Sequence, residues 1–197
     1  MAIKTANNQS MTAITSLSGV TAGNLVLIST ETASSSSTIT FDSGIDSTYK
    51  EYIFKYYDVH PSAGVRLAVN FRDGSTAYDA TKTSTFFEAY QNEAGTSTSV
   101  DYVTDYDLAQ STAVQSIGYI GNENDESCAG TLHLYDPSST TFVKHYIATT
   151  PGYHGSNLAL TSYVAGYCNV TVAIDGVQFS MTSGNIDSGT FKMYGVS

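Results

Sequence analysis

Acidic side chains gather in two segments where a hard cation could bind. Asp101, Asp105 and Asp107 form one group, and the run Asn-Glu-Asn-Asp-Glu at 122–126 forms the other. Calcium binds carboxylate and carbonyl oxygens, but it needs about six or more of them around one point. Neither segment has the spacing of a known calcium-binding loop. We therefore expect solvated loops here, and Asp101, Asp105 and Asp107 remain candidates for a metal site.

Two histidines suggest a second kind of chemistry. His133 and His145 would face each other if the two strands that carry them form a hairpin centred on Ser139. Two facing imidazoles can share a metal ion or respond to pH. Polar pairs across neighbouring strands are also ordinary on the outer face of a sheet. We expect no metal and no cofactor, and keep both histidines as candidate ligands.

Motifs of catalysis are missing from the sequence. It contains no GxSxG nucleophile turn, no phosphate-binding loop and no HExxH zinc motif. A glycosidase uses two carboxyl groups roughly 5 to 10 Å apart in space, a separation that a sequence does not reveal. We predict that the protein is not an enzyme. A glycan depolymerase remains an alternative, although the chain lacks the repeats of a β-helix.

Tyrosine is the most suggestive residue type for binding. The chain has 15 Tyr and 8 Phe but no Trp. Rigid aromatic rings among hydroxyl side chains suit the recognition of sugars or proteins. Most tyrosines should pack within sheets and subunit interfaces. Those in excess of core needs include Tyr102, Tyr106, Tyr119, Tyr153, Tyr163 and Tyr167. Tyr102, Tyr106 and Tyr153 are the candidate receptor-binding residues.

The elements that must position these side chains are strands. Apolar residues alternate with polar ones in short runs, most clearly from Val65 to Phe71 and from Val177 to Met181. Further strands are expected at 25–29, 39–41, 51–58, 85–90, 114–120, 131–135, 142–149, 170–174 and 190–196. About ten or eleven strands with no helix of core length predict an all-β, antiparallel β-sandwich, jelly-roll-like rather than an up-and-down barrel.

Turn residues predict how some of these strands connect. Strands 131–135 and 142–149 should form a hairpin through Pro137, and 170–174 should meet 177–181 in a second hairpin or a sharp corner. The serines at 34–37 should form a flexible connection, and the residues at 184–189 a turn. Strand 51–58 carries large side chains on both faces, so it should be central and covered on both sides.

Composition and charge bound the organisation of the chain. At 197 residues it should form one sandwich at 25–197, preceded by a docking arm at 1–24 that is either extended or a short helix. The net charge of −10 argues against nucleic acid and anionic membranes as partners. We expect no secretory signal and no membrane insertion. Cys128 and Cys168 should be isolated thiols, although their spacing leaves a disulfide open.

The C-terminal third of the chain resembles known virion proteins. The similarity lies in the runs GTLHLYDPSSTT at 130–141, AIDGVQF at 173–179 and SGNIDSGTFKMYG at 183–195. The segments 41–56 and 59–61 agree with it. These runs resemble virion structural proteins of marine tailed bacteriophages, cyanophage-like, of the fibre, receptor-binding or head-decoration type. The resemblance implies a β-sandwich that works as a trimer, and it brings no catalytic residues.

The resulting expectation is a phage fibre or tail-associated adhesion protein located in the virion. Its residues 1–24 would dock onto other virion proteins, and its loops would bind a host surface glycan or protein. The resemblance implies a homotrimer, and association also fits the sheet edges of an open sandwich, which must be paired or blunted where lysine is as scarce as it is here. The alternative is a capsid decoration or cement protein that stabilises the head.

Overall fold

Two antiparallel sheets make up the described part of the chain. The computed structural model describes residues 25–197, and the predicted docking arm at 1–24 lies outside them. The larger sheet has the order β1 (Leu25–Ser36), β12 (Ile186–Val196), β3 (Glu51–Pro61), β8 (Cys128–Tyr135), β9 (Lys144–His154), β10 (Leu158–Cys168), β5 (Lys82–Asn92) and β6 (Thr98–Tyr102). The smaller sheet has the order β2 (Thr38–Phe41), β11 (Gly176–Met181), β4 (Val65–Arg72) and β7 (Gln115–Ile120).

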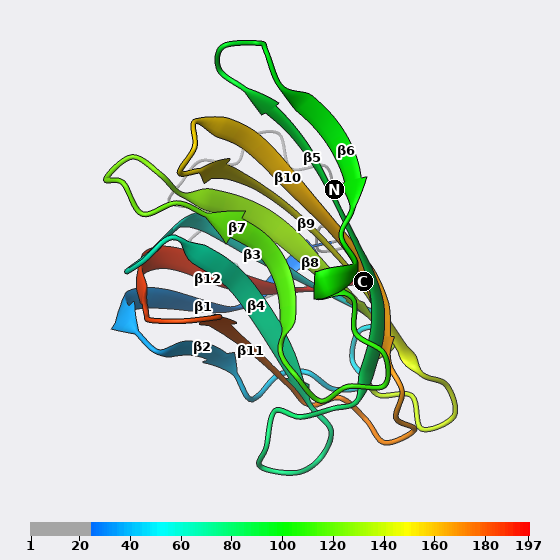
Figure 1. Cartoon of the computed structure of the whole chain (residues 1–197). Coiled ribbons are helices and arrows are strands. Elements are labelled where there is room, and N and C mark those ends of the chain that lie inside the picture. The colour runs from blue at the N-terminus through cyan, green and yellow to red at the C-terminus, as the bar shows by residue number, and fades with distance from the viewer. Residues whose placement is uncertain (1–24) are drawn as a thin grey trace, which may run out of the picture.

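The two sheets pack face to face, with the smaller one across the larger (Figure 1). The prediction of an all-β antiparallel sandwich is therefore confirmed. Among residues 25–197 the only helix is the 3₁₀ turn η1 (Thr104–Tyr106), and no helix there has the length or apolar character to cross a membrane.

Aromatic side chains fill the space between the sheets. Tyr52, Phe54 and Tyr56 alternate along β3 and are fully buried, as the period-two pattern predicts. The ring of Phe179, from β11 in the other sheet, lies 5.2–6.4 Å from four neighbouring rings, which belong to Phe41, Phe54, Tyr56 and Phe191. Burying one such side chain contributes about 1.5–3 kcal/mol, so this contact stabilises the sandwich strongly.

The strand that is covered on both faces is β4, and not the strand at 51–58 for which the sequence predicted this. β3 is central in its sheet, but its outer side chains Ile53 and Lys55 are only half-buried, so one face alone is covered. β4 is the strand covered on both sides. Ala68 and Asn70 are buried opposite Val69, and Asn70 Nδ2 donates to Thr112 O in the segment that follows η1.

Two segments near the C-terminal end were assigned wrongly from the sequence. The strand β10 was missed, although Leu158, Leu160 and Val164 alternate along it. Residues 170–174 are not a strand. The Lys144 ammonium donates hydrogen bonds to the carbonyl oxygens of Val170 and Val172, so these groups do not pair with a neighbouring strand. β11 pairs with β2 and β4 and forms no hairpin with 170–174, so of the two predicted connections the structure has the sharp corner.

The predictions for the serine- and glycine-rich segments at the β1 edge of the larger sheet were wrong. β1 continues to Ser36, and β12 already begins at Ile186, where a flexible connection and a turn were expected. Ser34 pairs with Ser188, and Ala33 pairs with Gly189. Backbone pairing with a neighbouring strand overrides the weak strand propensity of these residues.

The hairpin between β8 and β9 is confirmed, but its centre is displaced. His133 pairs with Ile147, and Leu134 pairs with Tyr146. His145 is therefore not opposite His133, and the predicted facing pair of imidazoles is wrong. Both histidines remain on the outer face of the larger sheet, which is the face turned away from the smaller sheet.

Candidate functional site

A stacked pair of aromatic rings stands on the outer face of the larger sheet. Phe87 on β5 pairs with Tyr163 on β10, and their rings lie 4.8 Å apart at an angle of 12°. Tyr102 on β6 pairs with Phe87 from the other side. Phe87 is 41% exposed and Tyr102 is 59% exposed. Three aromatic side chains on neighbouring strands thus present their rings to solvent.

Strand alternation puts these rings outside. On β5, Ser84, Phe86 and Glu88 point inward and are buried, so Phe87 must point outward. On β10, Ser162 and Val164 are buried in the same way, and Tyr163 lies between them.

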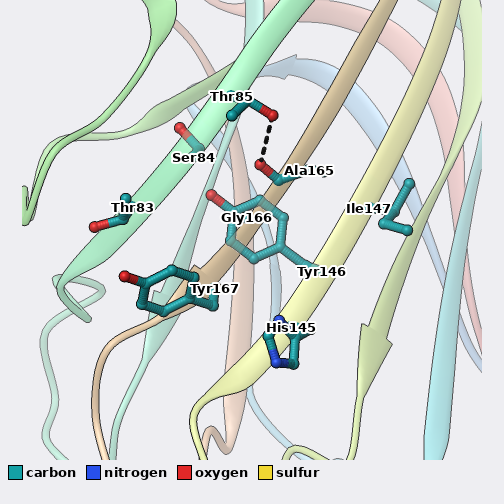
Figure 2. Close-up of a pocket in the computed structure, with 9 residues that line it drawn as sticks. All are labelled: Thr83, Ser84, Thr85, His145, Tyr146, Ile147, Ala165, Gly166 and Tyr167. Carbon is teal, nitrogen blue, oxygen red and sulfur yellow. Dashed lines mark hydrogen bonds between the residues drawn. The ribbon is translucent and has the colours of Figure 1, made fainter.

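A depression of about 450 Å³ lies on one side of the stacked pair (Figure 2). Ala165 forms a low point between Tyr163 and Tyr167 on β10. His145 and Ile147 line it from β9, and Thr83 and Thr85 line it from β5. Next to Ala165, Gly166 leaves room for Tyr146, because a Cβ at Gly166 would lie 2.7 Å from the Tyr146 ring.

A second depression, of about 660 Å³, lies on the other side of the pair. Small or compact residues form its floor, and amide and carboxylate groups form its rim. The hydroxyl of Tyr153 lies 3.1 Å from Glu93 Oε1 and 3.1 Å from Asn157 Oδ1. The bond to Glu93 raises the pKa of Tyr153. The lining residues are Gln91, Asn92, Glu93, Ser127, Ala129, Pro151, Gly152, Tyr153 and Ala159.

The two depressions and the stacked pair form one strip along β9, β10 and β5, which we call the aromatic strip. Its flat rings can stack against the apolar face of a sugar ring, and nearby hydroxyl and amide groups can bond to sugar hydroxyls. Such a strip is suited to binding an extended ligand.

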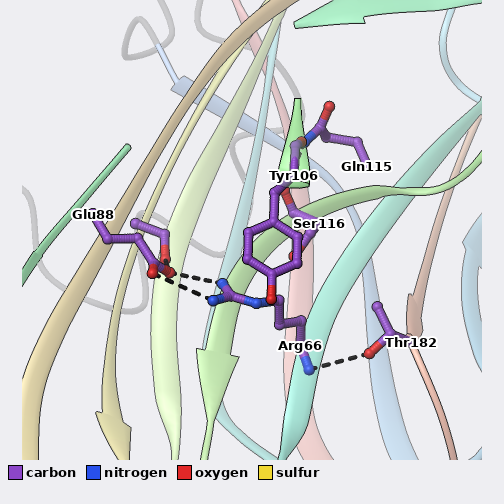
Figure 3. A network of polar contacts seen from close by, with 7 residues as sticks. Arg66, Glu88, Tyr106, Gln115, Ser116 and Thr182 are labelled. Atoms are coloured by element: carbon purple, nitrogen blue, oxygen red, sulfur yellow. Dashed lines mark hydrogen bonds and ion pairs between the residues drawn. The ribbon is translucent and has the colours of Figure 1, made fainter. Parts of the chain in front are cut away.

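The structure separates the three candidate receptor-binding tyrosines. Tyr102 and Tyr153 lie on the outer face of the larger sheet, beside the stacked pair and beside the second depression. Tyr106 does not. It is half-buried inside η1, where its ring lies 3.7 Å from the Arg66 guanidinium carbon and 5.2 Å from the Phe86 ring (Figure 3).

Arg66 and Glu88 form the main polar contact between the two sheets. Arg66 Nη1 donates to Glu88 Oε1 at 2.7 Å, and Nη2 donates to Oε2 at 3.3 Å (Figure 3). Ser162 Oγ also donates to Glu88 Oε1. Nearby, the His154 ring stacks 4.2 Å from Tyr119, and burial, followed by the charge of Arg66, lowers the pKa of His154. These buried contacts of Arg66 and Glu88 stabilise the packing of the two sheets against each other.

The candidate metal ligands are dispersed. Asp101 accepts a bond from Ser99, and Asp107 accepts one from Tyr102. His133 Nδ1 lies 2.6 Å from Glu51 Oε1. His145 packs edge-on against Tyr167. Asp105 is an exposed residue of η1. Over residues 25–197, no three His, Cys, Asp or Glu side chains come together as ligands of one metal ion.

The second acidic segment, 122–126, folds back on itself. The Glu126 carboxylate is buried and accepts a bond from the Glu123 backbone at 2.6 Å. His60 Nδ1 lies 2.7 Å from the backbone oxygen of Glu126. Cys128 and Cys168 are both free and buried, as expected from their spacing. Burial raises the pKa of the Cys168 thiol to about 12.

The sequence did not single out Phe87 as a candidate residue for binding. The alternation from Leu158 to Val164 was the signal that could have placed Tyr163 on a strand. No protein-family model matches the chain, and no curated protein matches it.

Proposed function

We propose that this protein is a non-enzymatic bacteriophage virion structural protein, specifically a fibre or tail-associated adhesion protein that binds a glycan of the host surface. The resemblance of its C-terminal third to virion proteins of marine phages supports the virion assignment. The exposed stack of Phe87 and Tyr163 between two depressions supports glycan binding, and it is the single observation that carries the proposal.

An exposed aromatic stack has a cost when nothing binds to it. Phe87 and Tyr102 keep large apolar rings in water, although a polar residue at either position would fit the outer face of a strand. Contiguous apolar patches that are rimmed by polar groups are typical of ligand and partner sites. The depressions on either side leave the rings of the stacked pair accessible to a sugar.

Two further parts of the proposal concern assembly. Residues 1–24 dock the protein onto other virion proteins, and the sandwich works as a homotrimer. Within residues 25–197, the edge strands β1 and β6 of the larger sheet have one neighbouring strand each, and their outer backbone groups could pair with a second copy. Light scattering on the purified chain should give three times the chain mass; the mass of one chain would contradict the trimer.

Binding to cells tests the adhesion proposal. Fluorescently labelled full-length protein is incubated with a panel of marine cyanobacteria, and the bound fraction is measured by flow cytometry. We expect the wild type to bind at least one strain and Phe87→Ala with Tyr163→Ala to bind at least ten-fold more weakly.

Phe142→Ala is the matched control, because Phe142 is 71% exposed in the β8–β9 loop and lies outside the aromatic strip. Equal binding by the wild type and the double variant would overturn the role of the strip. A reconstruction of the particle with one copy on every capsomer would instead favour the head-decoration alternative.

A further inference from the structure

Almost all the positive charge of the described chain is neutralised or buried. Residues 25–197 contain seven Lys and Arg. Three of them form ion pairs: Lys50 with Asp136, Arg66 with Glu88, and Arg72 with Asp175. Two more, Lys82 and Lys144, are fully buried and bond to backbone carbonyl oxygens. This leaves Lys55 and Lys192.

Lys55 and Lys192 lie directly opposite each other. They pair across β3 and β12 on the outer face of the larger sheet, and both are half-buried. Neither forms an ion pair within the described residues. Like charges directly across from each other destabilise a sheet. The chain has a net charge of −10 and therefore many acidic residues, but none of them lies between these two lysines in the pairing of β3 with β12.

The two lysines share one cross-strand row with the aromatic stack. The register joins one residue from each of the eight strands in turn: Thr30, Lys192, Lys55, Thr131, Thr149, Tyr163, Phe87 and Tyr102. Neighbouring strands are about 4.8 Å apart, so Lys55 lies roughly 14 Å from Tyr163 along the row. Two threonine hydroxyls fill the interval.

We propose that the ligand is an acidic polysaccharide that lies along this row, across the strands. Sugar rings stack on Phe87 and Tyr163, hydroxyl groups bond to Thr131 and Thr149, and carboxylate or sulfate groups of the ligand bind the ammonium groups of Lys55 and Lys192. The inference rests on the proposed adhesion function and adds the chemical class of the glycan.

Charge complementarity selects an anionic ligand. Two adjacent ammonium groups on a surface of otherwise negative protein form a local site that attracts an anion, while the rest of the surface repels it. Lys55 Nζ lies 5.7 Å from the centre of the Tyr194 ring, a contact that leaves its charge without a counter-ion. Because both lysines are partly exposed, binding should weaken as salt rises.

The test uses the same labelled protein and cells, with a Lys55→Gln and Lys192→Gln double variant. We expect this variant to bind cells at least ten-fold more weakly than the wild type. Alginate, which carries carboxylates, or dextran sulfate should compete with cells for the wild type, and neutral dextran should not. Which of the two acidic polymers competes identifies the anionic group.

Lys50→Gln is the control, since it removes one lysine charge at a site where the side chain is 80% exposed and lies away from the row. Thermal unfolding checks the fold of each variant, and the double variant should be at least as stable as the wild type because a repulsion is removed.

If the lysine variant binds cells like the wild type while Phe87→Ala does not, the proposal of an acidic ligand is wrong and the adhesion proposal stands. An equal loss with Lys50→Gln would also overturn the inference, because it would show non-specific attraction. If the wild type binds no cells, the adhesion proposal itself fails.

Discussion

Arg66 of the smaller sheet holds Glu88 of the larger sheet with two hydrogen bonds, and their side chains are only 13% and 11% exposed. Glu88 lies on the inner face of β5, and Phe87 lies on the outer face of the same strand. The interior contact therefore supports the position of the exposed one.

Removing the arginine should unfold the protein more easily. Arg66→Met leaves the Glu88 carboxylate buried without its cation, so we expect the free energy of unfolding to fall by about 3 kcal/mol. Urea unfolding measures it. Lys50→Gln breaks the exposed pair with Asp136 and should cost less than about 1 kcal/mol. Similar losses for the two variants would contradict a structural role for the Arg66 pair.

Tyr102 and Tyr106, two of the three candidate receptor-binding tyrosines, should behave differently when they are mutated. Tyr102→Ala should weaken cell binding and change the free energy of unfolding by less than about 0.5 kcal/mol, because Tyr102 is largely exposed. Tyr106→Ala removes the ring that packs on Arg66, so it should cost about 2 kcal/mol. Binding and urea unfolding of both variants check this. A Tyr102→Ala variant that binds normally but unfolds early would reverse the assignment.

Gly166 should not tolerate a methyl group. In Gly166→Ala the new Cβ would lie 2.7 Å from both the Tyr146 ring and Thr83 O, so the strands must shift. We expect a loss of about 1–3 kcal/mol in the free energy of unfolding. Gly155→Ala is the control, because the nearest atom to its Cβ is 3.7 Å away, and it should be neutral or slightly stabilising. Equal stability of the two variants would show that the contact with Tyr146 relaxes freely.

Lys82 should make stability depend on pH in the alkaline range. Burial lowers its pKa from 10.5 to about 8, against the smaller opposing effects of Cys168, Asp79 and Asp73. Between pH 8 and 10.5 the unfolded chain therefore binds a proton that the folded chain does not. The stability of the wild type, relative to Lys82→Met, should rise with pH across this window by up to about 1.4 kcal/mol per pH unit.

Below pH 8 both states bind that proton, so the difference should stay constant. Urea unfolding at several pH values, with the variant measured beside the wild type, cancels the titration of all other groups. A difference that does not change with pH would show that Lys82 keeps its ordinary pKa, and one that falls as pH rises would show that folding raises the pKa of Lys82; either result contradicts the prediction.

The alternation of residue types by itself determined which side chains of a strand share a face. It placed Leu67, Val69 and Phe71 of β4 together, and Val177, Phe179 and Met181 of β11 together, and all six are buried. That much follows from the period of two, because successive side chains of any strand point to opposite sides.

Only the tertiary structure decided which strands become neighbours. Phe87 meets Tyr163, and Lys55 meets Lys192, across long stretches of chain. Their faces follow from local alternation, but their register depends on how every strand between them packs, and a slip of one residue would turn each side chain to the other face. Tertiary contacts also decide the structure of residues 170–174. Their residue types alternate as in a strand, but the buried Lys144 ammonium donates hydrogen bonds to the carbonyl oxygens of Val170 and Val172.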